Sequence, residues 1–199
     1  FARVIHFDQT LGEEEDIGGG GRYSIFAPSS IESAEFSPGG WSAAYGGRSG
    51  SLLKLDVAGG SPTPSASLRV DIAGLALNYE GPRGIHDDTT LFFTARQFDF
   101  GEVFDMIEEL DIGDPELTDI VLKTVTSLDS GDTIEFLGIY APEEYTRDID
   151  NVLESPDFED VALIDTEQDL YLTGLTWRHL VGETGEWTNR LYYRANDKI

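Results

Sequence analysis

Apolar and polar residues alternate in several stretches of this chain, and glycine-containing turns separate the stretches. The first clear example is 65–73, where Leu68, Val70 and Ile72 alternate with polar or small neighbours. After Gly74 the alternation changes phase, which predicts either a β-bulge or a tight turn, because a slip of one residue moves every side chain to the opposite face. The pattern predicts a mainly β fold, with further strands over 89–98, 118–128, 133–141, 169–181 and 186–195.

The connections between these predicted strands differ in length and charge. Residues 83–88, 129–132 and 182–186 are short links, and the glycines of the last two suit hairpin turns. Residues 99–117 and 143–168 are long and acidic, and 102–110 in the first of them has the apolar spacing of a short α-helix. Short turns at one end and long loops at the other are typical of outer-membrane β-barrels, with the long loops outside.

Residues 28–57 are the most distinctive stretch, because a glycine-dense region separates an apolar–polar run from a strand-like one. This stretch resembles the closing segment of the plug domain of TonB-dependent outer-membrane receptors. In that family an Ile-Glu-x-x-Glu-apolar run leads through glycines to Ala-x-Tyr-Gly, and then to a strand that feeds the barrel. The matching residues are Ile31, Glu32, Glu35, Phe36, Gly40, Ala44, Tyr45, Gly46, Gly47, Arg48, Gly50 and Leu53.

The resemblance implies a fragment of a plugged transmembrane antiparallel β-barrel that has about 22 strands in the whole protein. Residues 1–60 would be the C-terminal part of an α+β plug domain, and 61–199 would be the first strands and loops of the barrel. It also implies ion pairs between plug and barrel, in which Glu32, Glu35 and Arg48 would meet inward-facing residues such as Arg69 or Arg96. Because open sheet edges are not tolerated in lipid, the predicted strands would need more strands beside them.

Composition narrows the choice of partners. The chain has 38 acidic and 13 basic residues and a formal net charge of −25. Such a charge repels nucleic acid, because phosphate binding depends on Lys and Arg. More than half of the acids lie in 99–119 and 143–169. No apolar run approaches the roughly 18–20 residues of a membrane-spanning helix, and the absence of cysteine excludes disulfides and thiolate chemistry.

Few residues suggest a ligand site, and none suggests catalysis. His6 and Asp8 have the spacing of neighbours on one strand face, and Glu13, Glu14 and Glu15 precede a glycine run. If the resemblance holds, these residues lie on the outer side of the plug, and we expect them to contribute to ligand binding there. A metal at His6 and Asp8, or Ca²⁺ held by the acidic outer loops, stays open as an alternative. No other cofactor is expected.

These features predict a TonB-dependent transporter of the bacterial outer membrane that binds and imports a scarce solute, such as a metal chelate, vitamin, oligosaccharide or peptide. Its partners would be the energy-transducing TonB complex, outer-membrane lipid and a surface lipoprotein. It would break no bond and so would not be an enzyme. The acidic loops favour cationic, metal-bearing or neutral ligands. Three alternatives stay open: a soluble acidic all-β binding module, a secreted glycoside hydrolase using two of the many carboxylates, and a barrel homologue with a structural role.

Overall fold

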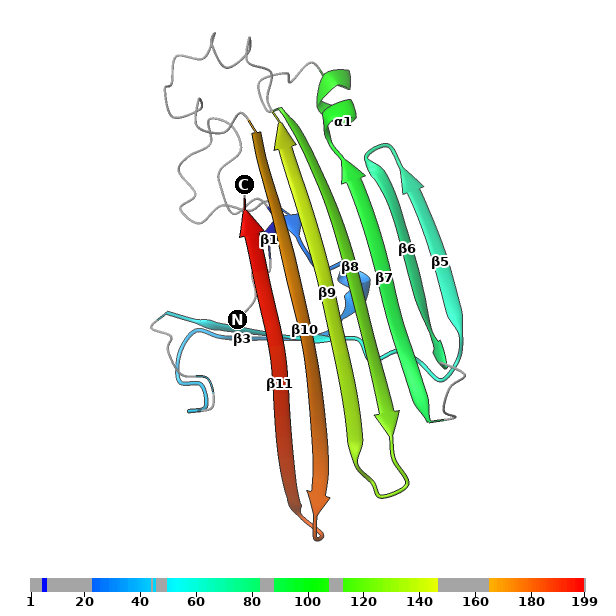
Figure 1. Ribbon diagram of the computed structural model, residues 1–199, viewed down its shortest axis with the longest axis vertical. Helices are drawn as coiled ribbons and strands as arrows, with labels where there is room; N and C mark the ends of the chain where they lie inside the picture. The colour runs from blue at the N-terminus through cyan, green and yellow to red at the C-terminus, as the bar shows by residue number, and fades with distance from the viewer. Residues whose placement is uncertain are drawn as a thin grey trace.

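A computed structural model describes residues 5–6, 23–43, 45, 50–82, 88–107, 113–146 and 165–198. Most of these residues lie in antiparallel β-sheets, as the sequence pattern predicted. The main feature is a seven-stranded sheet, called the large sheet below, in which each strand pairs with the next along the chain (Figure 1). Its strands are β5 (Ser65–Asp71), β6 (Gly74–Pro82), β7 (Thr89–Asp99), β8 (Asp114–Ser127), β9 (Thr133–Thr146), β10 (Asp165–Val181) and β11 (Gly185–Lys198).

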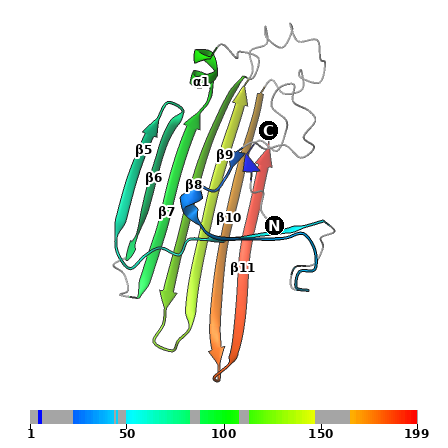
Figure 2. The same cartoon turned by 180° about the vertical axis from the view of Figure 1, so that it is seen from behind.

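The residues before position 61 form smaller elements on one side of the large sheet. Strand β1 (Ile5–His6) pairs with β2 (Tyr23–Ser24), and β3 (Ile31–Ser37) pairs with β4 (Leu52–Val57) after a 3-10 turn at Pro28–Ser30. Figure 2 shows these elements in front of the large sheet, with β3 and β4 running across its strands. The described residues up to position 60 are called the N-terminal segment below.

The strands of the large sheet extend further into the acidic stretches than the pattern predicted. Strand β8 begins at Asp114 rather than at 118, and β9 continues to Thr146 rather than ending at 141. The apolar alternation stops earlier, but the backbone ladder does not, because cross-strand hydrogen bonds do not depend on apolar side chains. The helix predicted over 102–110 is present as the shorter α1 (Gly101–Met106).

The phase change at Gly74 is a tight turn between two strands, one of the two predicted alternatives. Asp71 pairs with Gly74, so β5 and β6 form a hairpin. The β6 end of this hairpin lies close to β7, and a Cβ atom at Gly74 would collide with the carbonyl oxygen of Gln97. Only glycine fits this approach without a shift of the backbone.

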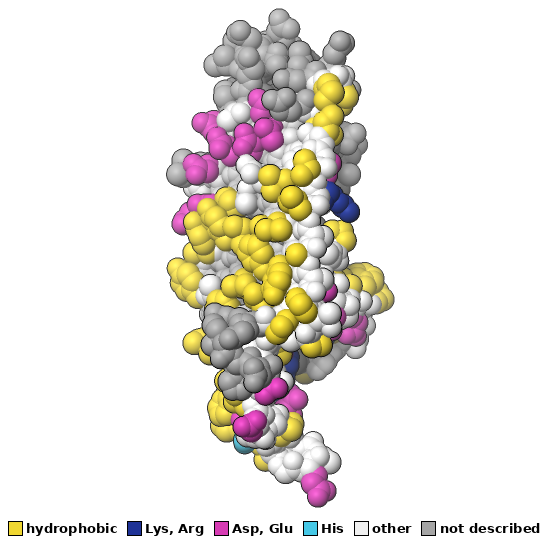
Figure 3. All heavy atoms as spheres, turned by 90° about the vertical axis from the view of Figure 1, so that its right-hand side faces the viewer, with side chains coloured by type: hydrophobic (Ala, Val, Ile, Leu, Met, Phe, Trp, Pro, Cys, Tyr) yellow, Lys and Arg dark blue, Asp and Glu magenta, His cyan; other side chains and the backbone are white. Residues whose placement is uncertain are grey.

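The two faces of the large sheet differ in chemistry. The face that contacts the N-terminal segment, called the inner face, carries Asn78, Arg96, Asp119, Glu143 and Arg194 among other polar residues. The opposite, outer face carries mainly apolar side chains, and many of them are exposed. They include Leu68, Val70, Leu75, Leu77, Phe136, Tyr171, Leu175, Trp177, Trp187, Leu191 and Tyr193. Figure 3 shows hydrophobic side chains over the middle of the molecule and acidic ones nearer its ends.

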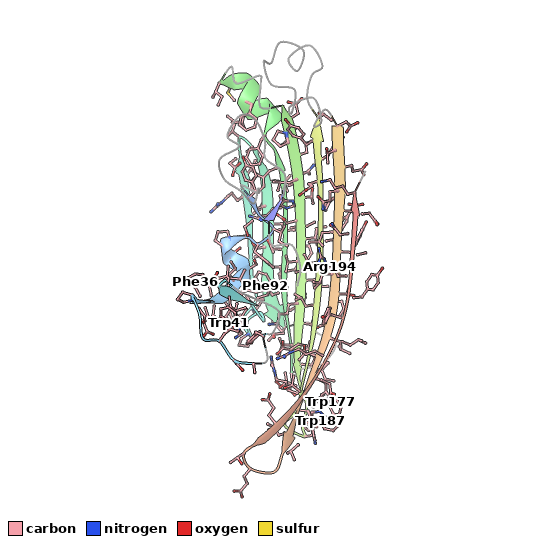
Figure 4. All side chains as sticks on the ribbon, turned by 90° about the vertical axis from the view of Figure 1, so that its left-hand side faces the viewer. Phe36, Trp41, Phe92, Trp177, Trp187 and Arg194 are labelled. Carbon is pink, nitrogen blue, oxygen red and sulfur yellow. The ribbon has the colours of Figure 1, made fainter. Side chains whose placement is uncertain are left out.

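A compact apolar core joins the N-terminal segment to the centre of the inner face. Ile25, Phe26 and Val57 pack against residues from four strands of the large sheet. In Figure 4, Phe92 lies between the large sheet and the side on which Phe36 and Trp41 are found. The strand residues of this core are Phe92, Val121, Ile139, Ala141 and Leu170.

Candidate functional site

The candidate site is the polar contact between the N-terminal segment and the inner face, with His6 at its centre. The imidazole of His6 is fully buried. Its Nδ1 lies 2.8 Å from Oε2 of Glu143, and its Nε2 contacts Oδ1 of Asp119. Both carboxylates are almost completely buried as well. An imidazole that hydrogen-bonds two carboxylates can donate to both only when it is protonated, because the neutral ring has a single N–H.

Arg96 extends this network on the inner face. Its guanidinium donates to Oδ2 of Asp119 at 2.5 Å and to the backbone carbonyl of Ser24 at 2.8 Å. One cation of β7 therefore holds both a carboxylate of the large sheet and the main chain of the N-terminal segment. The Nε of Arg96 is buried without a hydrogen-bond partner among the described residues, so the network is not fully satisfied.

The environment of His6 favours its charged form. Burial alone would lower the pKa of His6, because a buried ring loses the hydration of its charge. The hydrogen bonds to Asp119 and Glu143, together with the negative charges of these groups, outweigh burial and raise the pKa above its ordinary 6.5. A cation on the N-terminal segment thus sits between two acids of the large sheet. This is a charge-assisted contact, which is stronger than a neutral hydrogen bond.

A second polar contact lies closer to the short-turn end of the sheet. Nζ of Lys123 donates to the carbonyl of Val57 at 2.7 Å and lies 3.6 Å from Oε2 of Glu135. Arg178 pairs with the other oxygen of Glu135. The hydroxyl of Thr90 donates to the carbonyl of Gly59 at 2.8 Å. Strand β4 and the link after it are therefore held through main-chain carbonyls. Every residue has such a carbonyl, whatever its side chain.

The residues that resemble a plug motif lie mainly in and after β3. Ile31 packs against the core, whereas Glu32, Glu35 and Phe36 are exposed. Gly40 has a φ of 74°, as a turn glycine would. The backbone of Tyr45 accepts a hydrogen bond from the indole of Trp41 at 2.9 Å. Ala44, Gly46, Gly47 and Arg48 lie outside the described residues.

Among the described residues, no ion pair joins Glu32 or Glu35 to the large sheet, contrary to expectation. Glu35 lies opposite Lys54 in the β3–β4 ladder, and Arg96 binds Asp119 instead. The reason is geometric, since β3 and β4 pair with each other and Glu35 stays exposed on that ribbon. Apart from the packing of Ile31, the contact between segment and sheet is made by residues that the motif does not contain.

Only one of the predicted ligand-binding residues lies in the described part of the chain. His6 is described, and it faces the two buried carboxylates rather than solvent. Asp8, Glu13, Glu14 and Glu15 lie outside the described residues. Their role in ligand binding stays a prediction.

Two further expectations concern metals and membranes. Among the described residues, no group of three or more His, Asp or Glu side chains is arranged to hold a metal ion. Within the same ranges, none of the helices has the length and apolar character needed to cross a membrane. Most of the acidic stretch 143–168 falls in the undescribed range 147–164, so Ca²⁺ binding there stays untested.

No local pattern in the sequence indicates the His6 network. Asp119 and Glu143 lie 113 and 137 residues away from His6, and Glu143 lies beyond the predicted end of its strand at 141. One indirect signal was present: Asp119 occupies an inner-face position of β8, where a charge needs a partner. Comparisons of the chain with protein-family models, curated proteins and solved structures found no match.

Proposed function

We propose that this chain is part of a TonB-dependent transporter of the bacterial outer membrane. In this proposal the large sheet is part of the wall of a transmembrane barrel, and the N-terminal segment is part of the plug. The plug blocks the lumen until force from the TonB complex moves it and admits a solute. The chain's own residues bind the solute and release it, and they do not catalyse a reaction.

The observation that carries the proposal is the inverted arrangement of the two faces. In a soluble antiparallel protein the apolar face of a sheet packs inward and the polar face meets water. Here the N-terminal segment covers the polar, charged face, and the apolar face stays exposed, with Val70 at 74% and Leu191 at 75% of full exposure. A contiguous apolar face of this size marks contact with a partner or with lipid. Polar-in and apolar-out alternation is the pattern of barrels in lipid.

The dimensions of the outer face also suit a bilayer. On β10 the apolar positions run from Tyr171 to Trp177, and Trp187 lies one row further toward the turn. At about 3.4 Å per residue this band is roughly 20–27 Å long, close to the apolar height of outer-membrane barrels. Its two ends carry aromatic pairs, as interfacial girdles do: the rings of Tyr140 and Tyr171 lie 4.6 Å apart, and those of Trp177 and Trp187 lie 6.5 Å apart.

Beyond the tyrosine end the outer face becomes acidic. Four carboxylates form one cross-strand row over four strands, next to the acidic connections. These charges would lie above the hydrocarbon, on the side of the long loops. The row consists of Asp99, Glu116, Glu144 and Glu167.

The proposal requires further strands. Strands β5 and β11 are the margins of the large sheet, and no described residue pairs with their free edges. An unpaired edge in hydrocarbon costs several kcal/mol for each unsatisfied group, so lipid contact demands a closed barrel.

Fluorescence quenching by brominated lipid tests this proposal. The chain has three tryptophans, of which Trp177 and Trp187 lie on the outer face and Trp41 belongs to the N-terminal segment. In vesicles of phosphatidylcholine brominated along the acyl chains, emission from the full-length protein should be quenched. The variant Trp177→Phe/Trp187→Phe, which retains Trp41, should lose the part of the quenching that Trp177 and Trp187 contribute, whereas Trp41→Phe should not reduce the quenching.

The opposite result would favour a soluble binding module. The protein would then stay monodisperse without detergent, and brominated lipid would not quench the emission of Trp177 and Trp187. Such a protein does not place its apolar face in a bilayer. Hydrolysis of a sugar panel would instead point to a glycoside hydrolase.

A further inference from the structure

The charged residues of the β10–β11 hairpin are sorted between its two faces. All four of its cations, Arg178, Arg190, Arg194 and Lys198, occupy inner-face positions. The register fixes this assignment, because Arg194 lies opposite Leu172, which packs against the core. The hairpin has six acids, of which only Glu186 is on the inner face. The others lie on the outer face or in the turn: Asp165, Glu167, Asp169, Glu183 and Asp197.

This sorting contrasts with the rest of the chain. The protein has 13 basic residues and a net charge of −25, yet four of the bases share one face of one hairpin. On β8 and β9 the inner-face acids are Asp119, Glu135 and Glu143, and their ion pairs include those with His6, Arg96, Lys123 and Arg178.

The cations are spaced along the strand rather than clustered. Arg190, Arg194 and Lys198 recur every fourth residue on β11, which places them about 14 Å apart along the strand. Exposed Tyr192 and Asn196 lie between them on the same face. We call Arg190, Arg194 and Lys198 the basic row. It runs from near the short-turn end to the long-loop end of the inner face, the full length of the proposed lumen wall.

We propose that the basic row guides a small anionic solute, one bearing carboxylate, phosphate or sulfate groups, along the barrel wall. This inference rests on the proposed function and names its substrate class. Guanidinium groups bind planar oxyanions through two parallel hydrogen bonds, and a row of cations offers successive sites of similar strength. Arg194 and Lys198 already interact within the chain, so the solute exchanges with existing partners as it moves. The inferred substrate class therefore differs from the cationic, metal-bearing or neutral ligands expected from the acidic loops, because the basic row and not the loops lines the proposed lumen wall.

A cysteine placed between the cations of the basic row reports both the charge of the row and the access of water to it. The 199 residues contain no cysteine, so within them a single introduced thiol is the only target. Tyr192 and Tyr193 form a matched pair: they are adjacent, 67% and 65% exposed, and on the inner and outer face respectively. Full-length Tyr192→Cys and Tyr193→Cys, reconstituted in lipid vesicles, are treated with methanethiosulfonate reagents that carry either a sulfonate or a trimethylammonium group.

We expect the sulfonate reagent to label Tyr192→Cys roughly tenfold faster than the cationic one, after normalisation to a free thiol, because two cations lie about 7 Å away along the strand. Adding Arg190→Gln and Arg194→Gln should remove this preference, and 0.5 M salt should reduce it. Millimolar citrate should slow labelling only when the two arginines are present.

The outcomes separate this inference from the proposed function. Equal labelling of Tyr192→Cys by both reagents, or no labelling because the row is covered by the chain itself, overturns the anionic track and leaves the transporter intact. Labelling of Tyr193→Cys as fast as Tyr192→Cys shows that the outer face is in water, which overturns the proposed function. An unfolded variant is recognised by equal labelling at both positions in denaturant and in vesicles.

Discussion

Removal of the His6 imidazole should release the start of the N-terminal segment from the large sheet. His6→Ala deletes two buried, charge-assisted hydrogen bonds, to Glu143 and to Asp119. Breaking a buried ion pair from one side costs about 3–5 kcal/mol. Asp119 keeps Arg96, so we expect the lower end of that range, about 3 kcal/mol, which is roughly a hundredfold increase in the open population.

Hydrogen–deuterium exchange of peptides that cover 23–30 measures this opening in the full-length protein. His6→Ala should raise the exchange rate of these peptides about a hundredfold, while peptides from β8 and β9 should change little. His179→Ala is the matched control, because His179 bonds Asp132 at the short-turn end and is 41% exposed. It should leave exchange over 23–30 unchanged.

The same contact should depend on pH in a defined direction. The pKa of His6 is raised in the folded protein by Asp119 and Glu143 against the opposing effect of burial. A raised pKa means that the folded state binds the proton more tightly, so its stabilisation is complete below about 6.5 and is lost as the pH rises through the folded value. Corrected exchange over 23–30 should therefore increase in the alkaline range for the wild type and stay flat for His6→Ala. Protection that is constant or increases with pH in the wild type would refute the reasoning.

Three other substitutions test separate parts of the structure. If the outer face contacts lipid as proposed, Leu191→Arg, in the middle of the apolar band, should destabilise the protein by about 2–4 kcal/mol, whereas Tyr192→Arg on the inner face should have little effect, as urea unfolding in vesicles would measure. Gly74→Ala should destabilise the β5–β6 hairpin because its methyl group meets the carbonyl of Gln97, and equal thermal unfolding of variant and wild type would contradict this. Lys123→Met should free a β4 carbonyl at a cost of about 1–3 kcal/mol, seen as faster exchange over 52–58 with unchanged exchange over 23–30.

The large sheet could be predicted from the sequence because each strand carries its own signal. Alternation of Leu68 and Val70 with polar neighbours marks β5 without reference to any other strand, and Gly74 marks the start of the next strand. The strand ends were missed where charged residues replace the apolar ones, as at Glu143 and Glu144, because period-2 hydrophobicity disappears there while backbone pairing continues. Local patterns therefore reveal strands and turns but underestimate their length.

The contacts of the N-terminal segment could not be predicted in the same way. His6 belongs to a two-residue strand, which is too short to show a period, and its partners are more than a hundred residues away. The plug-like motif drew attention to Glu32 and Glu35, whose side chains stay exposed on the β3–β4 ribbon. Lys123 and Arg96 bind main-chain carbonyls of the segment. Every residue has such a carbonyl, so the sequence does not show which ones are bound.

The backbone ladders of the large sheet and its contacts with the N-terminal segment differ in how easily they can be exchanged. The proposed transporter needs this difference. The strands are held by backbone ladders that do not involve the N-terminal segment, so the sheet keeps its hydrogen bonds when the segment moves. The segment itself is held by a small apolar core and by discrete polar contacts centred on His6 and Lys123. Each polar contact is worth a few kcal/mol and can be replaced by water, since the groups it leaves are charged and hydrate well. A pull from the N-terminal side of β1 would load His6 before the other described contacts with the large sheet, because it precedes them in the sequence. Release would then proceed from the His6 end toward Val57, one contact after another, without unfolding the sheet.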